Sequence, residues 1–319
     1  MRRWILLALK LAISGGLLYW AFRGVDIGAV AGHLARLDAL WAAAALAALG
    51  VQIAIAGQRW TWIATALGAE LPGGRAIRYS AIAAFFNQAL PSTVGGDAMR
   101  VWLLGRADRR WKRAVYSVIV DRIAGVGFLA VVVAACLPWS LQLIAAPEGR
   151  AAVFVIGLGG VAGLIAAPLL GFVRPPARLA DWRLVRLAFE IAVAARRVLL
   201  DRARGVGIAL FSILIHLLTV WAAWCLARAI AISPSALDTL ILIPPVMLIS
   251  MIPISIGGWG IREGAMVVAF GYAGVEPSEA LAVSVLLGGS TLAIGVVGGA
   301  IWVAERGPAL AAAGAKPHG

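Results

Sequence analysis

The chain has 319 residues, 62% of them hydrophobic, and a mean hydropathy of +0.93. This composition excludes a water-soluble globular domain and predicts an all-α polytopic membrane protein. The formal net charge is +13, yet nucleic-acid binding is excluded too, because the basic residues lie in short loops and form no patch interleaved with aromatic residues. Basic loops of this kind mark the cytoplasmic side of a membrane.

Six apolar runs are predicted to cross the membrane as full spans. The first, residues 1–20, has no A-x-A cleavage site after it, so it is interpreted as a span with a cytoplasmic N-terminus rather than a signal peptide. An outer loop is expected at residues 23–38, and Arg59, Arg75 and Arg78 are expected in the next inner loop. The other five spans are predicted at residues 39–56, 114–137, 151–173, 205–230 and 280–303.

Two similar motifs stand about half the chain apart: FFNQALPSTVGGDAMR at residues 85–100 and IPISIGGWGIRE at residues 252–263. We interpret them as copies of an internal repeat. The alignment pairs Pro91 with Pro253, Thr93 with Ser255, Gly95-Gly96 with Gly257-Gly258, and Arg100 with Arg262.

Each motif predicts a broken helix. The proline ends the incoming helix, the Ser or Thr can cap a new one, and the glycines allow a sharp turn and a close approach. The arginine then lies about one turn into the second helix, where the helix N-terminus and its positive charge suit a phosphate or carboxylate. The alternative is a kinked packing element with a snorkelling arginine, but two matched copies favour a binding site.

Residues 76–104 are predicted to form a re-entrant hairpin. The apolar run before Pro91 is too short to span, and the loop after the motif, with Arg109 and Arg110, is the most basic of the chain. A second hairpin is expected at residues 233–272, giving an inverted repeat of residues 1–145 and 146–304. The tail, residues 305–319, is expected to be cytoplasmic and disordered.

Two further features carry charge. Residues 174–204 are predicted to form a cytoplasmic connector with an amphipathic helix, either on anionic lipids of the inner leaflet or packed on the domain as a linker. Asp121 and Arg122 are neighbours in a span and point in different directions, so each needs its own partner. We expect at least one of them to reach the motifs; the alternative is that Arg122 snorkels and Asp121 bonds locally.

The segments NQALPSTVGGDAMR, SVIVDRIAG and PISIGGWGIREG resemble the lysyl-phosphatidylglycerol-synthase transmembrane family, also described as flippase-like, over nearly the whole chain. The resemblance implies a role in moving or handling lipids in the bacterial inner membrane. The soluble aminoacyl-transferase half of true synthases is not recognised, so lysyl transfer is not expected. By motif match the resemblance points to Asn87, Pro91, Gly95, Gly96, Asp97, Arg100, Asp121, Arg122, Pro253, Gly257, Gly258 and Glu263; Thr93, Ser255 and Arg262 join the predicted substrate-binding set from the repeat.

The predicted function is therefore translocation of a lipid with an anionic or polar head group, without enzymatic activity, cofactor or metal. The expected partners are membrane lipids, with a homo-oligomer as a further possibility. One alternative is a non-catalytic membrane partner of a lipid biosynthetic complex. A membrane-embedded lipid-phosphate transferase is less favoured, because Asp97, Asp108 and Asp121 are scattered and no histidine lies near them in sequence.

Overall fold

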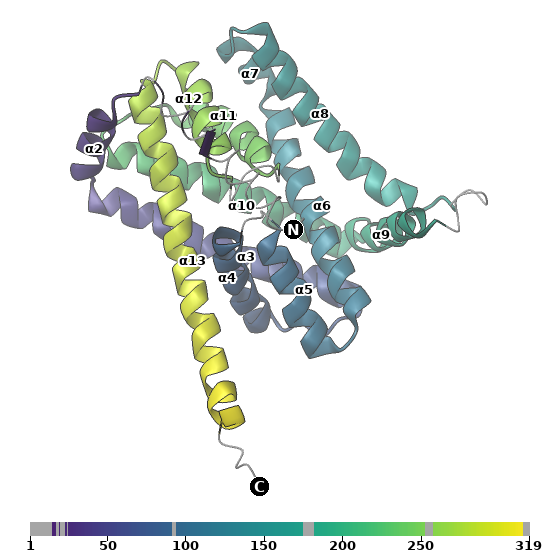
Figure 1. The fold of residues 1–319 in the computed structure, drawn as a ribbon. Helices are drawn as coiled ribbons and strands as arrows, with labels where there is room; N and C mark the ends of the chain where they lie inside the picture. The colour runs from purple at the N-terminus through teal and green to yellow at the C-terminus, as the bar shows by residue number, and fades with distance from the viewer. Residues whose placement is uncertain are drawn as a thin grey trace.

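The structure is a computed structural model that describes residues 15, 16, 19, 23, 25–90, 94–174, 182–252 and 258–314, with side chains to residue 305. The first predicted span, residues 1–20, lies almost entirely outside these residues. Within them the chain forms twelve α-helices and no strand (Figure 1). In chain order these are α2 (Ile27–Ala35), α3 (Ala39–Ala66), α4 (Gly73–Ala89), α5 (Gly95–Asp108), α6 (Trp111–Ala135), α7 (Leu137–Leu143), α8 (Pro147–Leu170), α9 (Arg183–Leu199), α10 (Arg202–Ala229), α11 (Ala236–Ser250), α12 (Ile261–Gly271) and α13 (Pro277–Gly314).

Five helices are long and apolar enough to cross a membrane: α3, α6, α8, α10 and α13. They confirm helices at five of the six predicted spans. The connection expected outside the membrane at residues 23–38 contains the short helix α2, whose N-cap Asp26 accepts a hydrogen bond from the Gly28 N–H at 2.8 Å. The predicted end of the second span was wrong, because α3 continues to Ala66 and Arg59 lies inside a span rather than in a loop.

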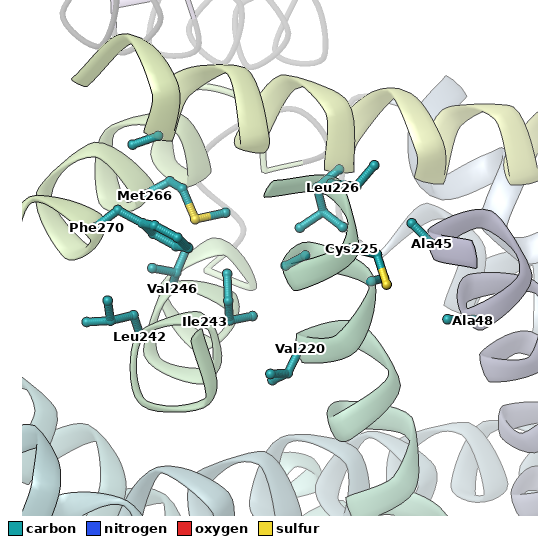
Figure 2. Packing of buried hydrophobic residues seen from close by; sticks show 14 of the residues in the cluster. Ala45, Ala48, Val220, Cys225, Leu226, Leu242, Ile243, Val246, Met266 and Phe270 are labelled. Carbon is teal, nitrogen blue, oxygen red and sulfur yellow. The ribbon is translucent and has the colours of Figure 1, made fainter. Parts of the chain in front are cut away.

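The largest hydrophobic cluster joins α3, α10, α11, α12 and α13. Figure 2 shows Val246 of α11 and Phe270 of α12 on one side of α10, and Ala45 of α3 on its other side. The α3 side consists largely of alanines, and small residues let helices of a membrane protein approach closely. This cluster therefore fixes the α11–α12 pair against the two long helices.

A second close contact holds α4 against α13. A Cβ added at Gly298 would overlap the Ala81 carbonyl group of α4, and Gly295 and Gly299 meet the backbone or ring of neighbouring α4 residues. Glycine is therefore required sterically where the two backbones meet. The helix α13 also extends beyond the predicted span into the segment expected to be the tail (Figure 1).

Helix α9 occupies the middle of the predicted connector and packs against α6, α8 and α10. Its buried residues include Ala195 and Val198, while Trp182, Leu184 and Val193 are exposed. The amphipathic helix is confirmed, and one of its faces packs on the protein. The packed face consists mainly of alanines, together with Val198.

Candidate functional site

The first motif forms a helical break. The helix α4 ends at Ala89, and α5 begins at Gly95, with Val94 as its N-cap. Pro91 and Thr93, and with them the predicted Thr93 cap, lie outside the described residues. Asn87 satisfies one N–H at the start of α5, since its Oδ1 accepts a hydrogen bond from the Gly96 N–H at 2.8 Å. A Cβ on Gly96 would overlap the α4 backbone and Asn87, so the glycine allows this contact.

The second motif breaks in a different place. The helix α11 ends at Ser250, and α12 begins at Ile261 rather than at the aligned glycine pair. Gly258 and Gly260 have φ angles of 80° and 88°, which favour glycine. Glu263 caps the helix by accepting the Gly260 N–H at 2.6 Å. Pro253, Ser255 and Gly257, and with them the predicted Ser255 cap, lie outside the described residues.

A buried carboxylate joins the first motif to two long helices. Asp121 of α6 is 4% exposed, and it pairs with Arg59 Nε of α3 and with an Arg100 terminal nitrogen of α5, each at 2.9 Å. Arg59 also donates to the Ser212 hydroxyl of α10 at 2.9 Å, and the Arg100 guanidinium lies 4.1 Å from the centre of the Trp60 ring. Two cations sharing one carboxylate leave an excess of positive charge here.

Arg122 and Asp97 form the neighbouring ion pair, with Nε 2.6 Å from Oδ2. Asp97 also lies 3.6 Å from Arg100. Asp121 and Arg122 thus both reach the first motif and do so through different partners, which confirms the predicted network. The alternative, in which Asp121 bonds only locally, was wrong.

The charge of the second motif is neutralised locally. A terminal nitrogen of Arg262 lies 2.5 Å from Glu263 Oε1. The Nε of Arg262 donates to the Ser284 hydroxyl of α13 at 3.2 Å. Ser284 donates to the same carboxylate oxygen at 3.1 Å. Glu263 is fully buried, and the Arg262 guanidinium lies 4.7 Å from the centre of the Trp259 ring.

Both arginines of the repeat line one cavity of about 350 Å³. Residues of α3, α4, α5, α6, α10, α11, α12 and α13 form its wall. The charged residues of this wall are four arginines and two aspartates: Arg59, Arg100, Arg122, Arg262, Asp97 and Asp121.

A family model described as the lysylphosphatidylglycerol synthase TM region matches residues 7–299. The chain belongs to this family. The search of curated proteins found no match to the chain. The resemblance carried by the three motifs is thus confirmed, and the protein is a multi-pass membrane protein of the lysylphosphatidylglycerol synthase TM family.

In this family member, several residues of the cavity were missed by sequence reasoning. Arg59 was assigned to a loop, although the apolar run WTWIATAL after it was a signal that the helix continues. His216 is another such residue: its Nε2 lies 2.8 Å from the Gly125 carbonyl oxygen, so it is packed and hydrogen-bonded. Of the predicted set, Asn87, Asp97, Arg100, Asp121, Arg122 and Arg262 line the cavity, whereas Gly95, Gly96, Gly258 and Glu263 are buried and do not line it.

Chemically, the site favours binding of an anion. Arginines outnumber acidic groups on the wall, and guanidinium groups pair with phosphate or carboxylate through fixed donor geometry. The described residues include no group of three His, Cys, Asp or Glu side chains positioned to bind a metal ion. Apolar residues of the wall, including Leu49, Ile53 and Leu287, surround these charges, and a charge interacts more strongly with a ligand in such surroundings than in water.

Proposed function

We propose that the protein is a lipid translocator of the bacterial inner membrane, which moves a lipid with an anionic or polar head group and catalyses no chemical reaction. The observation that carries the proposal is the cavity lined by Arg100 and Arg262 from both motifs, with more arginines than acidic residues. A charge in the middle of a membrane is unfavourable by at least ~2.5–3.5 kcal/mol unless it is paired or hydrated, so such residues mark binding sites and pathways.

Arg100 is the residue best placed to bind the head group. Its side chain is 11% exposed, and its Nε has no hydrogen-bond partner among the described residues. An unsatisfied buried donor is costly, so a phosphate or carboxylate oxygen that accepts from Arg100 would be stabilised there.

The helix contacts support an inverted repeat with re-entrant hairpins. Contacts of α3 with α4, α5 with α6, and α4 with α13 are repeated as α10 with α11, α12 with α13, and α11 with α6. In Figure 1 the α4–α5 pair lies in the lower part of the view and the α11–α12 pair in the upper part. We therefore propose that the two hairpins enter the membrane from opposite sides, with both chain termini in the cytoplasm.

Cysteine labelling tests this topology. Cysteines at positions 109 and 186 should react with a membrane-impermeant reagent only from the cytoplasmic side, and one at position 274 only from outside. Labelling of position 109 from outside would mean that the first hairpin crosses, and the inverted repeat would be rejected.

The function is tested by reconstituting the protein in liposomes that contain lipids labelled on an acyl chain and differing in head group. The wild type should move anionic lipids faster than zwitterionic ones. Arg100→Ala should reduce this rate by roughly tenfold or more, the effect of losing a charged hydrogen bond of at least ~1.5 kcal/mol. Arg78→Ala is the matched control, since Arg78 is exposed and pairs with exposed Glu305. Equal rates with and without protein would contradict the proposal.

A non-catalytic role beside a biosynthetic enzyme is the second candidate. One observation favours it: the α9 region exposes apolar side chains next to arginines, namely Trp182, Leu184 and Leu187 beside Arg183 and Arg186. A partner enzyme, a second copy of the chain or anionic lipids of the inner leaflet could each cover this surface. We propose that the lipid surface is its main partner. Purified protein that moves lipid without any partner would decide for the translocator.

A further inference from the structure

A second, largely apolar groove of about 450 Å³ lies between α5 and α6. On α6 its wall follows positions 115, 118, 119, 122 and 126, and on α5 positions 94, 97, 98 and 101. These spacings place one stripe of each helix against the other. Met251, at the end of α11, closes one part of the groove. Asp97 and Arg122 are the charged members of this wall, and most of the rest are valine, alanine or isoleucine.

The groove shares a wall with the central cavity. Four residues line both spaces: Asp97, Arg122, Val126 and Met251. The ion pair between Asp97 and Arg122 therefore stands between a charged interior and an apolar groove. Another apolar groove, between α8, α11 and α12, has no charged residue in its wall and shares none of its lining residues with the central cavity.

Arg122 is unusually placed for a residue of a membrane span. It lies near the middle of the 25-residue α6, yet its side chain is 39% exposed, against 13% for its partner Asp97. A charge at this depth normally faces a polar interior, because exposure to hydrocarbon is unfavourable. The partly exposed Arg122 side chain thus lies in the wall that the α5–α6 groove shares with the central cavity.

We propose that this groove is a lateral portal, in which an acyl chain of the transported lipid lies between α5 and α6 while the anionic head group occupies the central cavity. The proposal rests on the proposed function, since it concerns the same lipid. The anionic head group replaces Asp97 as the partner of Arg122, and Asp97 keeps a cationic neighbour in Arg100, 3.6 Å away. No charge is left unpaired during the passage, which keeps the barrier low.

The experiment fills the groove without touching the charges. Ala98 is exposed on the α5 wall, and Ala98→Phe should block it. Ala152→Phe is the matched control, because Ala152 is exposed in the unconnected groove between α8, α11 and α12. The probes are dioleoyl phosphatidylglycerol and its chainless head group, glycerophosphoglycerol. Binding of each is measured on purified protein, and translocation of acyl-labelled phosphatidylglycerol is measured in liposomes.

Ala98→Phe should slow translocation and weaken binding of the two-chain lipid by at least about tenfold, which corresponds to about two methylene groups left without apolar contact. Binding of the chainless head group should stay within about twofold, because the charges of the cavity are unchanged. Ala152→Phe should resemble the wild type in all three measurements. If Ala98→Phe does not fold, Val115→Phe fills the same groove from α6.

Wild-type rates in a folded Ala98→Phe protein would overturn the portal and leave the translocator proposal standing. Equal losses in Ala98→Phe and Ala152→Phe would also overturn it, because the α5–α6 groove would then have no special role. A wild type that neither binds nor moves the lipid would contradict the proposed function itself, and the portal with it. The ion pair has its own test: Arg122→Gln should reduce the preference for phosphatidylglycerol over phosphatidylcholine in translocation, and an unchanged preference excludes Arg122 from the passage.

Discussion

The arginines of the two motifs reach the same cavity with different partners. Arg100 is held by Asp121 of another helix at 2.9 Å and by the Trp60 ring of a third. Arg262 is held by its own neighbour Glu263 at 2.5 Å. The first motif therefore depends on the tertiary arrangement of α3, α5 and α6, whereas the second carries its counter-ion within one helical turn.

This difference indicates that the two motifs, although similar in sequence, have different roles in binding a ligand. A shared carboxylate with two arginines can exchange partners when an anion arrives, because one cation is always left for the ligand. The closed Arg262–Glu263 pair, with Ser284 bonded to both, has no such surplus. We infer that the first motif responds to the head group and that the second provides a fixed wall.

The largest expected effect is that of Asp121→Asn. The change keeps the shape but leaves Arg59 and Arg100 without their shared carboxylate, and losing one partner of a buried ion pair costs ~3–5 kcal/mol. The free energy of unfolding in detergent micelles measures this loss. Glu305→Gln is the control, because its pair with Arg78 is exposed and should contribute less than about 1 kcal/mol. Equal effects of the two changes would show that Asp121 is only a tolerated polar residue.

A double substitution tests the closed pair of the second motif. Arg262→Met alone leaves Glu263 buried without its cation, and adding Glu263→Gln should restore about 2–3 kcal/mol of the lost unfolding free energy. The equivalent double change in the first motif, Arg100→Met with Asp121→Asn, should restore much less, because Arg59 also loses its partner. Equal recovery in the two motifs would contradict the distinction between a closed pair and an open network.

The long helices could be predicted from the sequence because their signal is local. Apolar runs predicted five of the helices. The end of α4 at Ala89 was predicted too, because a proline disfavours the helical conformation of the residue before it. Arg59 was misplaced, although the apolar run after it was a local signal that α3 continues. A basic residue near the end of an apolar run normally marks a loop, but here a carboxylate 62 residues away neutralises it inside the protein.

The alignment of the two motifs did not predict where the second helix of each motif begins. The sequence pairs Gly95 with Gly257, yet α5 begins at Gly95 and α12 at Ile261. Gly258 and Gly260 adopt positive φ angles and delay the start of α12 by about one helical turn. As a result, Asp97 and Glu263 both occupy the third position of their helices, where a carboxylate meets the free N–H groups.

The packing of the two hairpins against α13 can be compared at two of its glycines. A Cβ at Gly298 would overlap the backbone of α4, whereas a Cβ at Gly288 would meet the end of the Arg262 side chain and the Trp259 ring. Gly298→Ala should therefore lower the unfolding free energy by about 1–3 kcal/mol, and Gly288→Ala by less, because a side chain moves more easily than a backbone. The reverse order, measured under the same conditions, would mean that Arg262 is fixed more rigidly than the contact between α4 and α13.

The smallest expected effect concerns how each motif caps its second helix. The Gly96 N–H of the first motif is satisfied by Asn87 from the preceding helix, whereas Glu263 caps α12 from inside that helix. Asn87→Ala removes the acceptor and should cost about 1 kcal/mol, or roughly a fivefold increase in amide hydrogen exchange at the start of α5 if that end opens locally. Asn87→Asp keeps an acceptor oxygen and adds a negative charge at the helix N-terminus, so it should leave exchange at the wild-type rate or slow it. If both changes accelerate exchange equally, the contact between α4 and α5 depends on the amide nitrogen of Asn87 rather than on the cap.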